Sequence, residues 1–348
     1  MGVGKALLVK GITLVIVLLA VLSLIVIVLG ATGVSDRILE AYVSEQLRQI
    51  RQELSQRIKD PAQLEQAIES YRQELRSAFG LDKPWYLRLP DMVRRVLTLD
   101  LGKSRSLTSF SGSNEVAVIV LERIPNTVVL ITTAVVISAL IGIFSGVKIA
   151  TKAGSRLDRA VSFLSSISYA MPSWWTGIIF ILVFSFYFRI FPPGGMYSTP
   201  PPEDPFTRGL DLLRHAALPV LTLVTAILGG WIYVSRTIVL NVAQEDFVEA
   251  ARVRGLPERI VMWRYILRPA APPIMTNVVF SIAGSIVGAI LTETVFNWPG
   301  MGRLYYEAIT AFDEPLIVAL TFLFTLIYII TRFILEVLYV LLDPRVRY

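Results

Sequence analysis

Cysteine is absent from the 348 residues of the chain, and histidine occurs once. Disulfides, thiolate-bound metals or clusters and histidine-rich metal sites are therefore excluded. The sequence also has no paired catalytic carboxylates, no H-E-x-x-H and no G-x-S-x-G. It has no G-x-x-x-x-G-K-[ST] phosphate loop, so nothing in it is expected to hydrolyse ATP. We expect a protein that is not an enzyme and that holds no metal or other cofactor of its own.

Charge is scarce as well, because 17% of the residues are charged, whereas a soluble domain has about a quarter. Hydrophobic residues make up 54% of the chain, and their long runs indicate a polytopic membrane protein in contact with the lipid bilayer. The net charge of +6 comes largely from arginines in the short segments between apolar runs. Such a bias marks loops that face the cytoplasm, and it argues against a nucleic-acid partner.

Six apolar runs predict an all-α fold of six transmembrane helices, with both termini in the cytoplasm. The runs cover residues 7–29, about 125–147, 160–190, 215–236, 271–291 and 316–342. The first run lies beside Lys5 and Lys10 and is longer than the apolar core of a cleavable signal peptide, which has about 7–15 residues. We therefore expect an uncleaved N-terminal anchor in the cell (plasma or inner) membrane.

The segment between the first two runs is expected to lie outside the cytoplasm. Apolar residues recur every three or four positions over 38–58 and again over 64–79, with Asp60-Pro61 between them. This periodicity predicts a helical hairpin whose apolar stripes face each other. A spacer and a part in substrate handling both stay open for it. The chain then divides into an N-terminal span (1–33), this insert (34–115) and a core of five spans (116–348).

A charged, amphipathic segment at 244–273 separates the fourth and fifth runs. Asp246 and Glu249 have the spacing of a helix N-terminal capping box. Gly255 suits the end of that helix, since a left-handed backbone costs glycine little. Pro257 and the acidic residue after it are typical of the first turn of a second helix. Two short helices joined at a glycine elbow are therefore expected to protrude from the membrane.

The same segment resembles the EAA motif of the inner-membrane permease subunits of ABC importers. Glu249-Ala250-Ala251 is followed after three residues by Gly255, and Arg268-Pro269 fits the ending used by the dipeptide/oligopeptide subgroup. Tyr265 departs from the general family pattern. An amphipathic loop without a special role is the alternative. The resemblance implies that the segment couples the chain to ATPase subunits through Asp246, Glu249, Ala250, Ala251, Arg254, Gly255, Leu256 and Arg259.

Further motifs of this subgroup follow one another along the chain. They are found at residues 80–84, 99–104, 122–127, 154–158, 215–222, 293–302, 313–315 and 343–347. Ordinary turn and cap residues explain each motif singly, but not their order. Within them, Asp158 is expected to form a local ion pair of little energetic weight.

Two motifs are candidates for bordering or gating a translocation pathway. The first breaks the third apolar run at Pro172, and a proline within a membrane helix frees carbonyls that neighbours or a water-lined cavity must satisfy. Its tryptophans are alternatively interfacial anchors. The second motif is expected to form a re-entrant turn on the outer side. The candidates are Pro172, Ser173, Trp174, Trp175, Glu293, Phe296, Pro299, Gly300 and Gly302.

The last two apolar runs carry features of helix packing. Gly284 and Gly288 have a small-xxx-small spacing, although glycines also suit the lining of a pathway. Arg332 and Glu336 lie four residues apart and are expected to pair with each other or with a neighbouring helix. The subgroup often has asparagine and aspartate at these places, so Arg332 either strengthens a subunit contact or narrows the vestibule.

The resemblance implies the type I ABC importer permease fold and a set of partners. These are a second, homologous permease subunit forming a heterodimer, two cytoplasmic ATPase subunits that bind ATP and Mg²⁺, and an extracellular solute-binding protein. Transport would proceed by alternating access. Short peptides are the expected cargo, with oligosaccharides, nickel or other small solutes as alternatives. A stand-alone secondary transporter would need buried carboxylates at mid-membrane, for which Glu336 is a candidate.

Overall fold

The computed structural model describes residues 3–84, 86–87, 94, 98 and 100–342. Within these residues the regular elements are helices, joined by loops and by one isolated bridge between Lys103 and Glu115. The all-α expectation is therefore confirmed for the described part of the chain. The expected cytoplasmic motif at 343–347, and residue 99 of the outer-loop motif, lie outside it.

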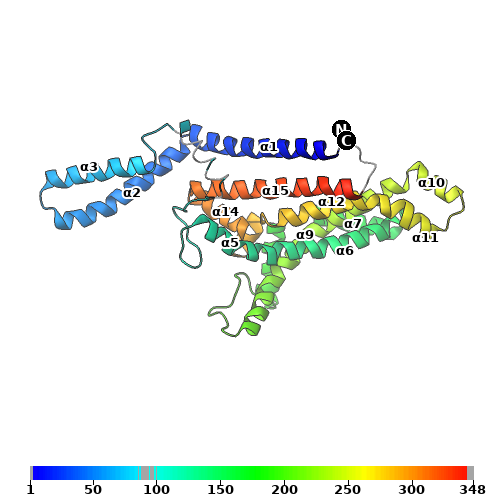
Figure 1. Ribbon diagram of the computed structural model, residues 1–348. Coiled ribbons are helices and arrows are strands. Elements are labelled where there is room, and N and C mark those ends of the chain that lie inside the picture. The colour runs from blue at the N-terminus through cyan, green and yellow to red at the C-terminus, as the bar shows by residue number, and fades with distance from the viewer. Residues whose placement is uncertain (1–2, 85, 88–93, 95–97, 99, 343–348) are drawn as a thin grey trace. The chain divides into compact units, whose positions relative to one another are not determined.

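The helices follow one another closely along the chain (Figure 1). They are α1 (Val3–Ala31), α2 (Val34–Arg57), α3 (Pro61–Ala78), α5 (Val116–Thr127), α6 (Thr133–Ala150), α7 (Arg156–Ala170), α8 (Ser173–Phe180), α9 (Pro205–Ala243), α10 (Asp246–Val253), α11 (Glu258–Ile260), α12 (Arg268–Ser285), α13 (Ile290–Val295), α14 (Met301–Thr310) and α15 (Glu314–Leu342). Three π-helical segments continue α5, α8 and α11, namely η1 (Val128–Thr132), η2 (Ile181–Tyr187) and η3 (Val261–Leu267).

The chain forms two compact units. The first consists of Met1–Gly11, Ile119–Glu307 and Ile327–Tyr348, and the second of Ile12–Val118 and Ala308–Leu326. Every interaction described below lies within one of these units.

Helix α9 is the centre of the first unit, where α6 and α7 both pack against it (Figure 1). Glycines make this approach possible. A Cβ atom on Gly142 of α6 would lie 2.3 Å from the Cβ of Trp231, and one on Gly229 would lie 2.2 Å from the carbonyl oxygen of Ser165. Because no side chain fits at such distances, small residues at these crossings decide how closely the helices pack.

In the second unit, α2 and α3 lie side by side and are joined at residues 58–60 (Figure 1). Val43, Leu47 and Ile68 are buried between them, so the two apolar stripes pack against each other. The turn is defined by Asp60, whose side chain accepts a hydrogen bond from the Ala62 N–H at 3.0 Å. Proline at the first helical position and an aspartate cap before it are the ordinary start of a helix.

Three continuous helical stretches among the described residues are long and apolar enough to cross a membrane: Val116–Ala150, Pro205–Ala243 and Glu314–Val337. A fourth is added if Arg156–Ala170 and Ser173–Tyr187, which meet at 94°, count as one broken span. Leu8–Val21 is a shorter apolar stretch within α1. By length and composition the structure therefore supports a multi-pass membrane protein, and six spans stay a prediction.

The expected fifth span is interrupted, and the glycine contact predicted for it is wrong. Helix α12 ends at Ser285, and Gly288 lies outside any helix with a φ of +96°. A Cβ atom on Gly288 would lie 2.3 Å from the backbone nitrogen of Gly302, whereas Gly284 has open space around it. Gly288 therefore lies at a crossing of two backbone segments, and within the described residues the two glycines do not share a helix–helix contact face. The lining of a pathway stays a prediction for them.

Candidate functional site

The segment predicted to couple the chain to a partner folds as two helical pieces joined by a turn, which we call the elbow (residues 246–267). Helix α10 begins at Asp246, and Gly255 in the turn has a φ of +76°, which favours glycine. The capping box is wrong, because Glu245 holds the cap position and no side chain caps the helix. The two acidic residues instead lie in the first turn, at the positive end of the helix dipole.

The second piece of the elbow begins one residue later than expected. Pro257 holds the cap position, and α11 starts at Glu258 and continues into η3. A salt bridge of 3.2 Å between Arg252 and Glu258 joins the two pieces across the turn. A cavity of about 370 Å³ lies on this side of the unit, bordered by Thr151, Arg252, Glu258 and Trp263.

The elbow is anchored on one face and exposed on the other. Val248 and Ala251 are buried in a cluster with Val239, Val261 and Ile266. The other face carries large apolar side chains in the open; Phe247, Val253, Ile260 and Trp263 are 44%, 83%, 38% and 64% exposed. Grouped apolar side chains on a polar, protruding surface are typical of a contact with another protein.

The predicted coupling residues fall on both faces. Ala251 is buried and Leu256 half-buried, while the others are exposed: Asp246, Glu249, Ala250, Arg254, Gly255 and Arg259.

The third apolar run is broken where the sequence predicts, between α7 and α8. The Ser173 hydroxyl lies 2.9 Å from the hydroxyl of Thr292 in α13, which ties the break to the other candidate motif. Pro172 is exposed, and Trp174 and Trp175 are 38% and 44% exposed. The broken helix therefore presents its proline and its two indole rings at the surface of the unit.

Glu293 is the polar centre of the second motif and is fully buried. Its carboxylate accepts hydrogen bonds from the backbone N–H of Arg303 at 2.8 Å and of Ala289 at 3.3 Å, and from the Thr127 hydroxyl at 3.2 Å. A Cβ atom on Gly300 would lie 2.5 Å from the Glu293 Oε2 atom, so glycine leaves room for the carboxylate. Burial raises the pKa of the Glu293 carboxyl above its usual value, and these hydrogen bonds offset only part of that rise.

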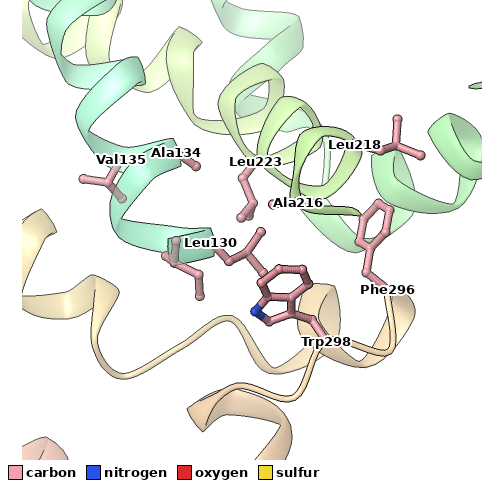
Figure 2. Close-up of a cluster of buried hydrophobic side chains, with 9 residues drawn as sticks. Leu130, Ala134, Val135, Ala216, Leu218, Leu223, Phe296 and Trp298 are labelled. Atoms are coloured by element: carbon pink, nitrogen blue, oxygen red, sulfur yellow. The ribbon is translucent and has the colours of Figure 1, made fainter. Parts of the chain in front are cut away.

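Phe296 and Trp298 extend the motif into an apolar cluster with Leu130 and Leu218 (Figure 2). The Trp298 indole N–H donates to the carbonyl of Asn126 at 2.9 Å, and the Asn126 amide donates to the carbonyl of Pro299 at 2.9 Å. The structure therefore brings the second group of candidates together as a buried support that holds the C-terminal end of α5, where it continues into η1. The residues of the α7–α8 break lie at the surface instead.

Two ion pairs complete the polar framework of the first unit. Arg236 binds both carboxylate oxygens of Asp158, with distances of 2.5 and 2.8 Å, and Asp158 is 2% exposed. The expectation of a local pair is wrong, because the partner belongs to α9, 78 residues away. Sequence spacing gives no signal for such a contact. Glu336 lies 3.3 Å from Arg332 and also pairs with Lys10 of α1.

Comparison with known proteins finds similarity to membrane components of transport systems. Residues 138–348 match the family model described as "Binding-protein-dependent transport system inner membrane component". The chain is 33% identical to the di/tripeptide transport system permease protein DppB of Pseudomonas aeruginosa (strain UCBPP-PA14), over 77% of this chain and 83% of that protein. It is 29% identical to the oligopeptide transport system permease protein AppB of Bacillus subtilis (strain 168), over 80% and 85%.

Proposed function

Since the chain belongs to the family of binding-protein-dependent transport system inner membrane components, we propose that it is the permease subunit of a peptide importer. The elbow carries this proposal, because it combines an anchored face with an exposed apolar face. ATP hydrolysis belongs to partner subunits, as the family description of a membrane component implies. A stand-alone secondary transporter is not favoured, since the carboxylate of Glu336 is paired with two cations.

The proposed mechanism is alternating access driven from the elbow. ATP binding closes a pair of ATPase subunits, and the closure moves the elbow of each permease subunit as a rigid body. Rigidity comes from the buried residues of α10 and from the turn at Gly255. The six exposed coupling residues supply the contact, and Ala251 and Leu256 support them from beneath.

The proposed topology has six spans, the elbow and both termini in the cytoplasm, and the α2–α3 hairpin outside as an insert between the first two spans. The partners are a second permease subunit, two ATPase subunits and an extracellular binding protein that delivers the cargo. The long helical stretches and the arginines around the elbow support this arrangement. The break at Pro172 borders the pathway, and the buried motif around Glu293 holds that break in place through Thr292.

The test is purification of the intact complex from its native membrane, followed by mass spectrometry of its subunits and of the material bound to its binding protein. We expect two ATPase copies, one further permease and short peptides. Bound sugars or nickel would overturn the peptide assignment while leaving the importer intact. A complex that contains neither an ATPase nor a binding protein would overturn the importer assignment.

A further inference from the structure

A second cavity of the first unit lies where α7 ends and the chain turns into α8. Its volume is about 370 Å³, and its other walls come from α9 and α12. The residues that line it fall near the middle of α9, at 226–234, and of α12, at 277–281. Binding sites of membrane transporters are commonly found at such breaks, near the middle of the membrane.

Several polar groups of this lining have no hydrogen-bond partner in the part of the chain that the structure describes. They are the hydroxyls of Tyr169 and Ser281 and the indole N–H of Trp231, whose side chain is 8% exposed. Asn277 donates its amide to Pro273 at 2.8 Å, and its amide oxygen accepts no hydrogen bond there. Tyr169 is 76% exposed, Asn277 is exposed and Ser281 is half-buried, so Trp231 is the one side chain of the four that is more than nine-tenths buried. A polar group of a buried side chain normally finds a partner, so the indole N–H of Trp231, with three accessible polar groups beside it, points to a ligand.

The lining contains no charged side chain, since its remaining members are Ser173, Gly230 and four apolar residues. The described residues also contain no group of three or more metal-ligating side chains. An ion or a fixed terminal charge therefore finds no partner in this lining. The free groups are two hydroxyls, one N–H donor and one amide acceptor, beside apolar surface. This combination suits a neutral chain of amides whose side chains vary.

We propose that this cavity binds the main-chain amides of a peptide during its passage. Tyr169, Trp231, Asn277 and Ser281 donate to or accept from the peptide backbone, while the apolar wall tolerates different side chains. The inference rests on the proposed function and deepens it, since it names the part of the cargo that the permease contacts. It also predicts that peptides of different charge pass equally well, because the lining has no charged residue that would discriminate between them.

The first test measures uptake by the complete complex in proteoliposomes, with trialanine, Ala-Lys-Ala and Ala-Glu-Ala as probes. Ser281→Ala removes one hydroxyl and breaks no hydrogen bond within the described chain. Loss of one hydrogen bond to the cargo predicts uptake about three- to ten-fold slower for all three probes. Ser166→Ala is the matched control, because this exposed serine of α7 donates only to the Ser162 carbonyl of its own helix, at 2.9 Å.

Unchanged uptake by Ser281→Ala, or a loss confined to one charged probe, overturns the inference and leaves the proposed function standing. A wild-type complex that imports none of the three probes counts against the proposed function itself.

The absence of cysteine provides an independent test, because Ser281→Cys then carries the one thiol of the subunit. We expect an uncharged thiol reagent to label it in the intact complex. Trialanine delivered by the binding protein should slow the labelling at least three-fold, and should leave labelling of Ser166→Cys unchanged. Equal labelling of Ser281→Cys with and without trialanine overturns the inference.

Discussion

At the scale of single residues, two positions matter for opposite reasons: Glu293, which is buried, and Gly255, which is exposed. Glu293 is surrounded by donors, so both of its carboxylate oxygens act as acceptors. Gly255 has open space around it, and its φ of +76° is what makes it special. Glu293 is required by the hydrogen-bond donors around it, and Gly255 by its positive φ. Substitutions at the two positions should therefore act in different ways.

Glu293→Gln should destabilise the subunit by about 1–3 kcal/mol, because its NH2 group replaces one accepting oxygen and then faces a hydrogen-bond donor from which it cannot accept. The measurement is thermal unfolding of the purified complex in detergent. Glu203→Gln is the control, since Glu203 lies exposed in the loop before α9 and should leave the unfolding temperature unchanged. Equal unfolding temperatures for Glu293→Gln and the wild type would show that the carboxylate is not needed as a double acceptor.

Gly255→Trp should uncouple transport from ATP hydrolysis, because a side chain at this φ strains the turn by about 1–3 kcal/mol and covers the exposed face of the elbow. The ratio of peptide imported to ATP hydrolysed in proteoliposomes measures the effect. Gly255→Asn is the matched variant, since asparagine tolerates a left-handed backbone, and it should retain most of the coupling. Normal transport by Gly255→Trp would remove the elbow from the coupling mechanism.

At the scale of elements, helix α9 organises the first unit through close crossings. Gly142 and Gly146 of α6 meet it on one side, and its own Gly229 meets α7 on another. The bidentate pair of Asp158 and Arg236 adds a charged contact between α7 and α9 near the start of α7. These crossings set the position of the break after α7, and with it the walls of the second cavity.

Gly229→Ala should destabilise the subunit by about 1–3 kcal/mol through overpacking, because its Cβ would lie 2.2 Å from a backbone oxygen that cannot move freely. Gly209→Ala is the matched control on the same helix. Nothing lies within 4 Å of a Cβ at that position, and alanine is the better helix former, so stability should hold or rise slightly. Thermal unfolding compares the two, and equal losses would contradict close packing at Gly229.

At the scale of the whole molecule, the proposed topology assigns the α2–α3 hairpin and the elbow to opposite sides of the membrane. The two elements differ in how far their apolar side chains are exposed. The hairpin buries its apolar stripes between its own helices, while the elbow leaves four large apolar side chains exposed. A closed pair of helices suits a spacer or an outward-facing insert, and an open apolar face suits a permanent protein partner.

Single-cysteine mapping tests this topology in a chain that has no cysteine of its own. Ser55→Cys, exposed on α2, should react with a membrane-impermeant maleimide added outside intact cells. Arg254→Cys, exposed on the elbow, should react only after the membrane is opened. Labelling of both from the same side would contradict an odd number of spans between them.

The sequence by itself determined the membrane class, the helical fold and the family, because these depend on composition and on ordered local motifs. Long apolar runs exclude a soluble fold, and a glycine, a proline and a D-x-x-E spacing mark the elbow within a few residues of its observed bounds. The pairing of apolar stripes in α2 and α3 was predictable for the same reason, since periodicity is a local property of each helix.

Only the tertiary structure decided where the motifs lie relative to one another. It placed Glu293 and Phe296 in a buried support, gave Asp158 a partner 78 residues away, and made Gly288 a backbone crossing. It also brought together the four polar residues of the second cavity, which belong to three helices and share no sequence pattern. Contacts between distant segments depend on how helices cross, and crossing distances are set by pairs of residues that no local spacing connects.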